Sequence, residues 1–265
     1  MKKTKEASPI PTNSHFEPGG FTDSSPREKG KVTATLGTLE EVLENIQRAI
    51  EATEKLKQGL LQELLTKGVG RPSVRGVPEG WRRVSLGEIG AWQYGMAAYN
   101  PTGKAGTKLL RAADIAEDRT IDWIALPQYP INDMMYKRYG LKEGDIILVR
   151  MGSKVSKGCY VERPPRAVFA SSLVRFQPRV PLYRRYLYFF FQSPRYLGQM
   201  EIKISTKSNP ILFSHSLAKL TMPLPPLKEQ KRIAEILDDV ECKLSLLKTK
   251  KRSFEGIKGA LRSNK

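Results

Sequence analysis

The chain has 265 residues, 40% of them hydrophobic, and a formal net charge of +18 at pH 7. That length and apolar fraction suffice for one large or two small folded domains, which excludes a disordered polymer. The longest apolar run, at residues 186–191, is far shorter than the roughly 20 residues of a membrane span, and the N-terminus lacks the apolar core of a signal peptide. We therefore expect a cytoplasmic protein with no membrane association.

The positive charge is concentrated in the middle of the chain. Residues 71–227 contain 24 Lys and Arg against 11 Asp and Glu, a net charge of +13, whereas residues 1–35 carry +2, residues 36–70 carry −2 and residues 228–265 carry +5. Such a surplus repels itself unless a polyanion offsets it, and nucleic-acid phosphate is the commonest partner of this kind. The alternative is a well-solvated basic surface.

Residues 1–35 are rich in Pro, Gly, Ser and Thr and predict a flexible tail. The pattern then changes, and residues 36–70 show the three-and-four spacing of a coiled-coil helix. Two members of its seam, Thr53 and Lys57, are polar. The full seam is Leu36, Leu39, Leu43, Ile46, Ile50, Thr53, Lys57, Leu60 and Leu64.

Residues 71–227 alternate short apolar runs with turn residues, which predicts strands and loops around one helix at Leu182–Met200. We expect a mixed α/β domain and an overall α+β fold class. The runs that predict strands are "TKLLRAADI", "GDIILVRMGS", "AVFASSLVRFQP" and "IKISTKSNPILF".

Three prolines, Pro223, Pro225 and Pro226, close this domain and predict a rigid elbow before a second long helix, residues 228–265. An SH3-type ligand is the rival interpretation of "PLPPL", but the prolines directly precede a helix. The second heptad seam is Ile233, Leu237, Val240, Leu244, Leu247, Lys251, Phe254, Lys258 and Leu261. The two amphipathic helices must pair with each other, with a second copy or with another protein.

The sequence lacks the usual motifs of catalysis and metal binding. Residues 152–159 contain glycines and lysines, but not in the order of a phosphate-binding loop, and no methyltransferase Asn/Asp-Pro-Pro-aromatic run is present. Two cysteines, Cys159 and Cys242, and two histidines, His15 and His215, are too few for a zinc site or a catalytic triad. We interpret the thiols as free, His215 as structural, and the acidic segment Asp114, Glu117, Asp118 and Asp122 as a solvated loop rather than a nuclease metal site.

Several stretches, in this order, resemble the specificity subunit of type I restriction–modification systems, in a half-length form with one target-recognition domain. They are "LKQGLLQELLTKGVG", "VPEGWRRVSLGEIG", "LLRAADI", "LKEGDIILVRMGS", "ASSLVRFQP" and "MPLPPLKEQKRIAEILDDVE". The resemblance covers about residues 39–265.

The resemblance implies a non-catalytic subunit that reads double-stranded DNA and recruits methyltransferase (M) subunits through its long helices, with restriction (R) subunits joining the assembly. The same resemblance implies that it binds no cofactor itself and that S-adenosylmethionine, ATP and Mg belong to the partner subunits. A full-length member has two recognition domains, whereas one domain reads one half-site. A homodimer with antiparallel helices then implies an interrupted palindromic site; a truncated full-length gene, or a half that pairs with a different half, is also open.

The DNA-binding candidates lie on three loops, "YNPTGKAGTK", "RMGSKVSKG" and "STKSNP", and at Arg111, which opens "RAADI", because recognition domains of this family read DNA through loops and strand ends. We expect the lysines to contact phosphate, and Arg111, Arg150 and Asn209 to have the geometry for base edges. Near the first loop, Trp92, Tyr94 and Tyr99 either pack on a sugar or base or belong to the core. The candidates are Asn100, Lys104, Lys108, Arg111, Arg150, Ser153, Lys154, Lys157, Ser205, Lys207, Ser208 and Asn209.

Two other functions remain as alternatives. An assembly protein would compete for methyltransferase through its helices without salt-dependent DNA binding. A stand-alone regulator would bind its site tightly without methyltransferase.

Overall fold

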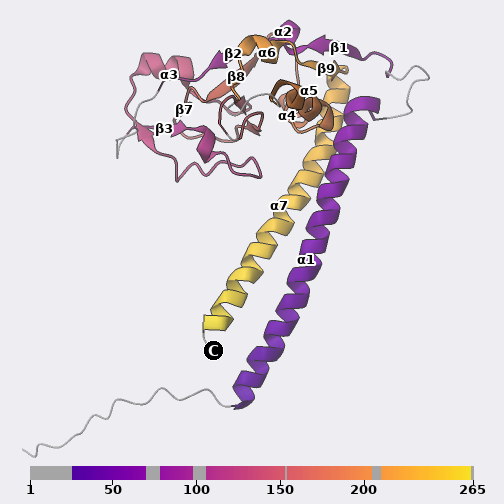
Figure 1. Ribbon diagram of the computed structural model, residues 1–265, viewed down its shortest axis with the longest axis vertical. Coiled ribbons are helices and arrows are strands. Elements are labelled where there is room, and N and C mark those ends of the chain that lie inside the picture. The colour runs from indigo at the N-terminus through magenta and orange to yellow at the C-terminus, as the bar shows by residue number, and fades with distance from the viewer. Residues whose placement is uncertain (1–25, 70–77, 98–105, 153, 205–209, 264–265) are drawn as a thin grey trace, which may run out of the picture.

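Two long helices, α1 (Pro26–Lys67) and α7 (Leu227–Ser263), lie side by side and carry the globular part of the chain at one end (Figure 1). This computed structural model describes residues 26–69, 78–97, 106–152, 154–204 and 210–263. At 1.5 Å per residue, α1 is about 63 Å long and α7 about 55 Å. No helix among the described residues is both long and apolar enough to cross a membrane.

Helix α1 begins ten residues before the predicted boundary at residue 36, so residues 26–35 are helical and the predicted tail is too long. Pro26 is tolerated in a first turn, where its missing N–H has no helical acceptor. The Lys, Arg, Glu and Ala residues that follow favour helix despite Gly30 and Gly37. The rest of the predicted tail, residues 1–25, lies outside the described residues.

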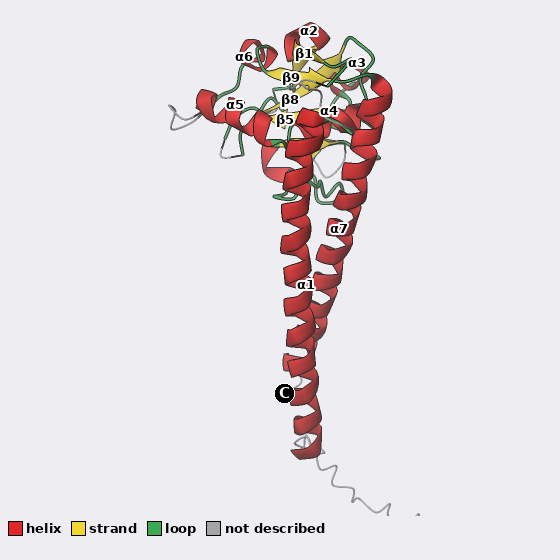
Figure 2. Ribbon diagram, turned by 90° about the vertical axis from the view of Figure 1, so that its right-hand side faces the viewer, coloured by secondary structure: helices red, strands yellow, loops and turns green. Residues whose placement is uncertain are grey.

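The two predicted seams face each other within the chain. Leu39, Ile46 and Ile50 of α1 are buried, and Ile46 and Ile50 form one apolar cluster with Leu244 of α7. Because Leu247 and Phe254 pack on the same cluster, α7 covers α1 well beyond the globular domain. Of the three pairing alternatives, the structure therefore shows the helices paired with each other, as a helical hairpin (Figure 2).

Polar contacts fix the register of this hairpin. In each of the three contacts between α1 and α7 given next, the two residue numbers have the same sum, as two antiparallel helices without a shift in register require. The contacts are those of Glu40 with Lys258 (2.8 Å), Gln47 with Lys251 (2.9 Å) and Lys57 with Glu241 (2.7 Å).

The strands described within the globular domain, residues 78–226, form three small sheets. A four-stranded antiparallel sheet has the spatial order β2 (Gly90–Tyr94), β8 (Leu173–Pro178), β5 (Ile146–Val149) and β6 (Gly158–Tyr160). A three-stranded sheet has the order β4 (Gln128–Tyr129), β3 (Thr107–Leu110) and β7 (Ala167–Phe169), with β3 and β7 parallel. A ribbon of β1 (Arg82–Ser85) and β9 (Thr221–Leu224) joins the two ends of the domain.

Short helices complete the domain and confirm the predicted α+β class. The helix α4 presents a buried aromatic run, Tyr186–Phe190, to the four-stranded sheet and to α7. The helices are α2 (Leu86–Ile89), a 3-10 turn (Ala112–Asp114), α3 (Asp133–Tyr139), α4 (Arg184–Phe190), α5 (Pro194–Ile204) and α6 (Ser214–Ala218).

Two predicted elements are wrong. The single helix expected at Leu182–Met200 is divided into α4 and α5, because Pro194 has no N–H to continue a helix and starts a new one instead. The buried Ser193 caps the new helix by accepting a hydrogen bond from Tyr196 N (3.2 Å). The described residues of the run "IKISTKSNPILF" form no strand: its first three residues end α5, and Ile211 makes only an isolated bridge to Met151.

The proline elbow lies where the domain meets the hairpin. Helix α7 begins at Leu227, directly after Pro226, whose carbonyl accepts from Gln230 N (3.0 Å). In the same first turn, Glu229 accepts hydrogen bonds from Trp81 Nε1 (2.8 Å) and Val69 N (3.2 Å). The first turn of α7 therefore holds both chain connections between the hairpin and the domain.

Candidate nucleic-acid interface

Arg150 follows β5 and joins three segments that are distant in sequence. Its Nη1 donates to the Ser171 carbonyl (2.9 Å) and its Nε to the Leu212 carbonyl (3.2 Å). Its guanidinium lies over the Tyr94 ring, 4.6 Å from the centroid, and the Tyr94 hydroxyl accepts from Ser214 N (2.7 Å). Among the described residues, Nη2 of Arg150 has no hydrogen-bond partner.

The strand ends explain why these segments meet. Strand β2 ends at Tyr94, β8 begins at Leu173 and β5 ends at Val149, all at one edge of the antiparallel sheet. Segments at this edge flank the three predicted DNA-binding loops. Tyr94–Ala97 leads into the first loop, Arg150–Gly152 opens the second, and Pro210–Ser214 follows the third. We call this group of Tyr94, Arg150, Ser171, Leu212 and Ser214 the Arg150 junction. The sequence predicted three loops, and the structure brings their anchors together at one residue.

Lys154, Lys157 and Arg111 form a second group, beside the 3-10 turn. Lys154 Nζ donates to the Ile115 carbonyl (2.6 Å), and Lys157 forms an ion pair with Glu117. The Arg111 guanidinium binds Asp114 with two hydrogen bonds (2.9 and 2.7 Å), which raise its pKa above the ordinary value. All three cations thus have internal acceptors in the free protein.

Lys108 lies apart from both groups. It is on β3, and its Nζ donates to the carbonyls of Ile124 (2.9 Å) and Leu126 (3.0 Å), so it stabilises the loop before β4. The remaining candidates lie outside the described residues: Asn100, Lys104, Ser153, Ser205, Lys207, Ser208 and Asn209.

The aromatic residues near the first loop differ in environment. Trp92 is partly buried and packs against the core, edge-on to Phe176 (4.9 Å between ring centroids). Tyr94 is 37% exposed and belongs to the Arg150 junction. Tyr99 lies outside the described residues.

Sequence reasoning missed an exposed aromatic pair next to this junction. Phe213 and His215 stack with ring centroids 5.7 Å apart and planes 13° apart, and Phe213 is 43% exposed. Stacked aromatic rings are surfaces on which bases and sugars pack. The only sequence signal was an aromatic residue and a histidine two positions apart after a Pro-containing loop.

The acidic segment makes local contacts. Asp118 accepts from Thr120 N (3.1 Å), Asp122 accepts from Ile124 N (3.0 Å), and a hydrogen bond from Lys157 lowers the pKa of Glu117. Within the described part of the chain, no group of three His, Cys, Asp or Glu side chains is placed to hold a metal ion. Both thiols are free, as predicted, with Cys159 buried and Cys242 exposed.

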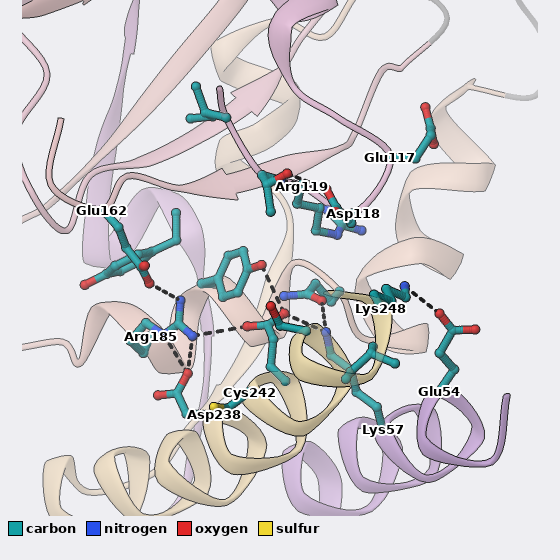
Figure 3. A pocket seen from close by; sticks show the side chains of 18 of the residues that line it. Glu54, Lys57, Glu117, Asp118, Arg119, Glu162, Arg185, Asp238, Cys242 and Lys248 are labelled. Atoms are coloured by element: carbon teal, nitrogen blue, oxygen red, sulfur yellow. Dashed lines mark hydrogen bonds and ion pairs between the residues drawn. The ribbon is translucent and has the colours of Figure 1, made fainter. Parts of the chain in front are cut away.

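A cleft of about 1210 Å³ separates the globular domain from the hairpin (Figure 3). Both basic and acidic side chains line it, with Arg119 and Glu162 on the domain side and Lys248 and Glu54 on the hairpin side, the last two 2.7 Å apart. This mixed charge distinguishes the cleft from the Arg150 junction.

Comparison with known proteins gives a consistent result. The family model for the type I restriction modification DNA specificity domain matches residues 78–255. The chain is 24% identical over 246 residues to the type I restriction enzyme MjaVIII specificity subunit of Methanocaldococcus jannaschii, covering 87% of this chain and 57% of that protein. The chain thus spans about half the length of the curated relatives that it matches.

Two solved structures share the fold. They are the HsdS subunit from Thermoanaerobacter tengcongensis (TM-score 0.58, 22% identity, 89% of this chain and 56% of that chain) and the type I restriction-modification S subunit from M. genitalium (TM-score 0.62, 18% identity, 89% and 60%).

Proposed function

Because the chain belongs to the type I restriction modification DNA specificity domain family, we propose that it selects the DNA sequence on which a restriction–modification complex acts. In this proposal the globular domain is a recognition domain that reads one half-site of double-stranded DNA. Methylation and cleavage, with S-adenosylmethionine, ATP and Mg, belong to methyltransferase and restriction subunits.

The observation that carries the proposal is the Arg150 junction. It anchors three basic or amide-rich loops at one edge of a domain whose segment has a net charge of +13, from 24 basic and 11 acidic residues. Phosphate contacts by the lysines would position the domain, and Nη2 of Arg150, which has no hydrogen-bond partner among the described residues, would be available to a base edge. The exposed Phe213–His215 pair adds a stacking surface beside the same loops.

The hairpin is proposed to bind methyltransferase subunits and a second copy of the chain. Its inward seam is already filled, so a homodimer would pack one hairpin on another rather than exchange helices. Leu56, Leu246 and Ile257 remain 52%, 66% and 49% exposed on the hairpin and would contribute to such contacts. Two hairpins packed in opposite directions would place a recognition domain at each end and would read an interrupted palindrome.

The test is selection from random duplex DNA by the full chain, alone and with its methyltransferase subunit, followed by salt titration of the selected site. We expect one enriched motif and an affinity that falls steeply with salt, because several phosphates are neutralised. An assembly protein would join the methyltransferase without enriching any motif. A stand-alone regulator would enrich the same motif equally well without methyltransferase.

A further inference from the structure

A polar network joins α1, α7 and the recognition domain along one wall of the cleft (Figure 3). Arg185 of α4 donates to Asp238 through Nε (2.7 Å) and Nη2, and to Glu241 through Nη2 (3.1 Å). Glu241 also accepts from Lys57 Nζ of α1 (2.7 Å) and from the Tyr188 hydroxyl (3.3 Å).

The network reaches further into the domain on both sides. Lys57 Nζ donates to Gln192 Oε1 (2.9 Å), and Arg185 Nη1 donates to Glu162 (3.3 Å). The Arg185 guanidinium also lies 4.7 to 5.2 Å from the ring centroids of Tyr160, Tyr188 and Phe189. Partial burial acts to lower the pKa of Arg185, but its hydrogen bond and charge interactions with Asp238 and Glu241 together outweigh burial and raise the pKa, so the guanidinium stays charged.

This arrangement explains the polar residue in the α1 seam. Lys57 is only 8% exposed and occupies a heptad position where an apolar side chain would pack between the helices. A buried charge in a seam contributes little net stability, since the cost of desolvation offsets its ion pair. Such a residue instead fixes how the helices and the domain that carry its bonding partners are aligned.

The position of the network along α7 shows how it could fix the angle between the domain and the hairpin. Both chain connections meet at the first turn of α7, where Glu229 binds Val69 and Trp81. Next to that turn, the domain shares one buried core with Leu61 and Leu65 of α1 and with Ile233 and Leu237 of α7. Glu241 lies twelve residues further along the helix, about 18 Å away, and provides a polar attachment at the far end of the apolar contact made by Ile233 and Leu237. Beyond it, the open cleft leaves room for the domain to swing if the attachment is lost.

We propose that the network of Lys57, Glu241 and Arg185 is a positioning device that fixes the angle of the recognition domain on the hairpin. Given the proposed function, this angle would set the distance between the two half-sites that a pair of recognition domains reads. Lys57 and Arg185 would then influence spacer selectivity without touching DNA.

The test measures the angle directly, without DNA. Spin labels are attached at Met134→Cys on α3 and Ser253→Cys on α7 in a Cys242→Ser background, and their distance distribution is measured by pulsed electron resonance. Met134 is 76% exposed, and the buried Cys159 remains in place. We expect a single narrow distribution that broadens or shifts in Lys57→Met and in Arg185→Gln.

The matched control is Lys251→Met. Lys251 is also a seam lysine, and it binds Gln47 of the opposite helix at 2.9 Å, but it has no contact with the recognition domain among the described residues. This variant should leave the distribution unchanged. Unchanged distributions in both Lys57→Met and Arg185→Gln, with folding verified by circular dichroism, would overturn the proposal.

A second readout connects the angle to spacing. In complexes with methyltransferase, the preference for the native spacer over one base pair more or less should fall roughly tenfold in Lys57→Met, corresponding to about 1.4 kcal/mol. Affinity for a single half-site should not change. Absence of DNA binding by the unmodified chain would refute the proposed function, but the distance measurement would still decide whether the network holds the domain at a fixed angle.

Discussion

Arg150 shows what a single residue contributes to the candidate site. Its side chain spans three chain segments with two hydrogen bonds and a cation–π contact, and it keeps one nitrogen without a described partner. Lysine cannot reproduce this, because an ammonium is a point charge without a planar fork. The other described candidates, Lys108, Arg111, Lys154 and Lys157, are bound to acceptors within the protein, and in the proposed function they would exchange these acceptors for phosphate.

We predict that Arg150→Lys weakens binding to the selected half-site by about 1–3 kcal/mol and relaxes the preference at one base pair. Competition anisotropy with single-base variants of the site measures both effects. The control is Arg179→Lys, because Arg179 is exposed at the opposite end of β8. Equal affinities for Arg150→Lys and the parent chain would remove Arg150 from the reading surface.

The two thiols should differ in reactivity. Burial raises the pKa of Cys159 to about 12, whereas Cys242 is exposed. At pH 8 the native protein should therefore take up maleimide at Cys242 alone, and denatured protein at both positions, as read by mass spectrometry. The raised pKa of Cys159 in the folded protein also makes stability depend on pH. The protonated thiol contributes fully to stability below the ordinary thiol pKa of about 8.5, and this contribution is lost as pH rises through the pKa of Cys159 in the folded protein. Native labelling of Cys159 as fast as Cys242 would contradict its burial.

At the scale of elements, heptad periodicity was the most reliable signal. It identified the inward faces of both long helices, because residues that repeat at steps of three and four lie along one face of a helix. It did not explain why Thr53 and Lys57 interrupt the seam; Lys57 bonds across to Glu241 and Gln192, a tertiary contact that no local pattern contains. A strong local pattern also gave a wrong prediction. The apolar run through Tyr196 predicted one helix, but Pro194 divides it into two.

The hairpin should depend on its apolar seam more than on its surface. Ile50 is 5% exposed in a cluster with Ile46 and Leu244, so Ile50→Ala should lower the free energy of unfolding by about 2–5 kcal/mol. The exposed neighbour Glu51 is the control, and Glu51→Ala should change it by less than about 0.5 kcal/mol. Urea titration followed by helical circular dichroism measures both. Similar values for the two variants would show that the helices do not pair through this seam.

For the whole molecule, the sequence predicted a basic domain between two long helices, and the structure adds their arrangement. Pairing of α1 with α7 in one chain leaves the recognition domain at one end of the hairpin (Figure 1). The loops were predictable as basic segments between strands, but their meeting at Arg150 was not, since it depends on strand order in the sheet. The angle between domain and hairpin likewise follows from contacts between residues more than 130 positions apart, such as Lys57 with Gln192.

In the proposed function, this chain chooses the DNA sequence that its complex modifies. The most direct measurement is genome-wide mapping of methylated adenine in a host that expresses the methyltransferase subunit with and without the chain. We predict one interrupted palindromic motif that is methylated only when the chain is present. An asymmetric motif would exclude the symmetric homodimer, and a methylation pattern that is the same with and without the chain would contradict the proposed function.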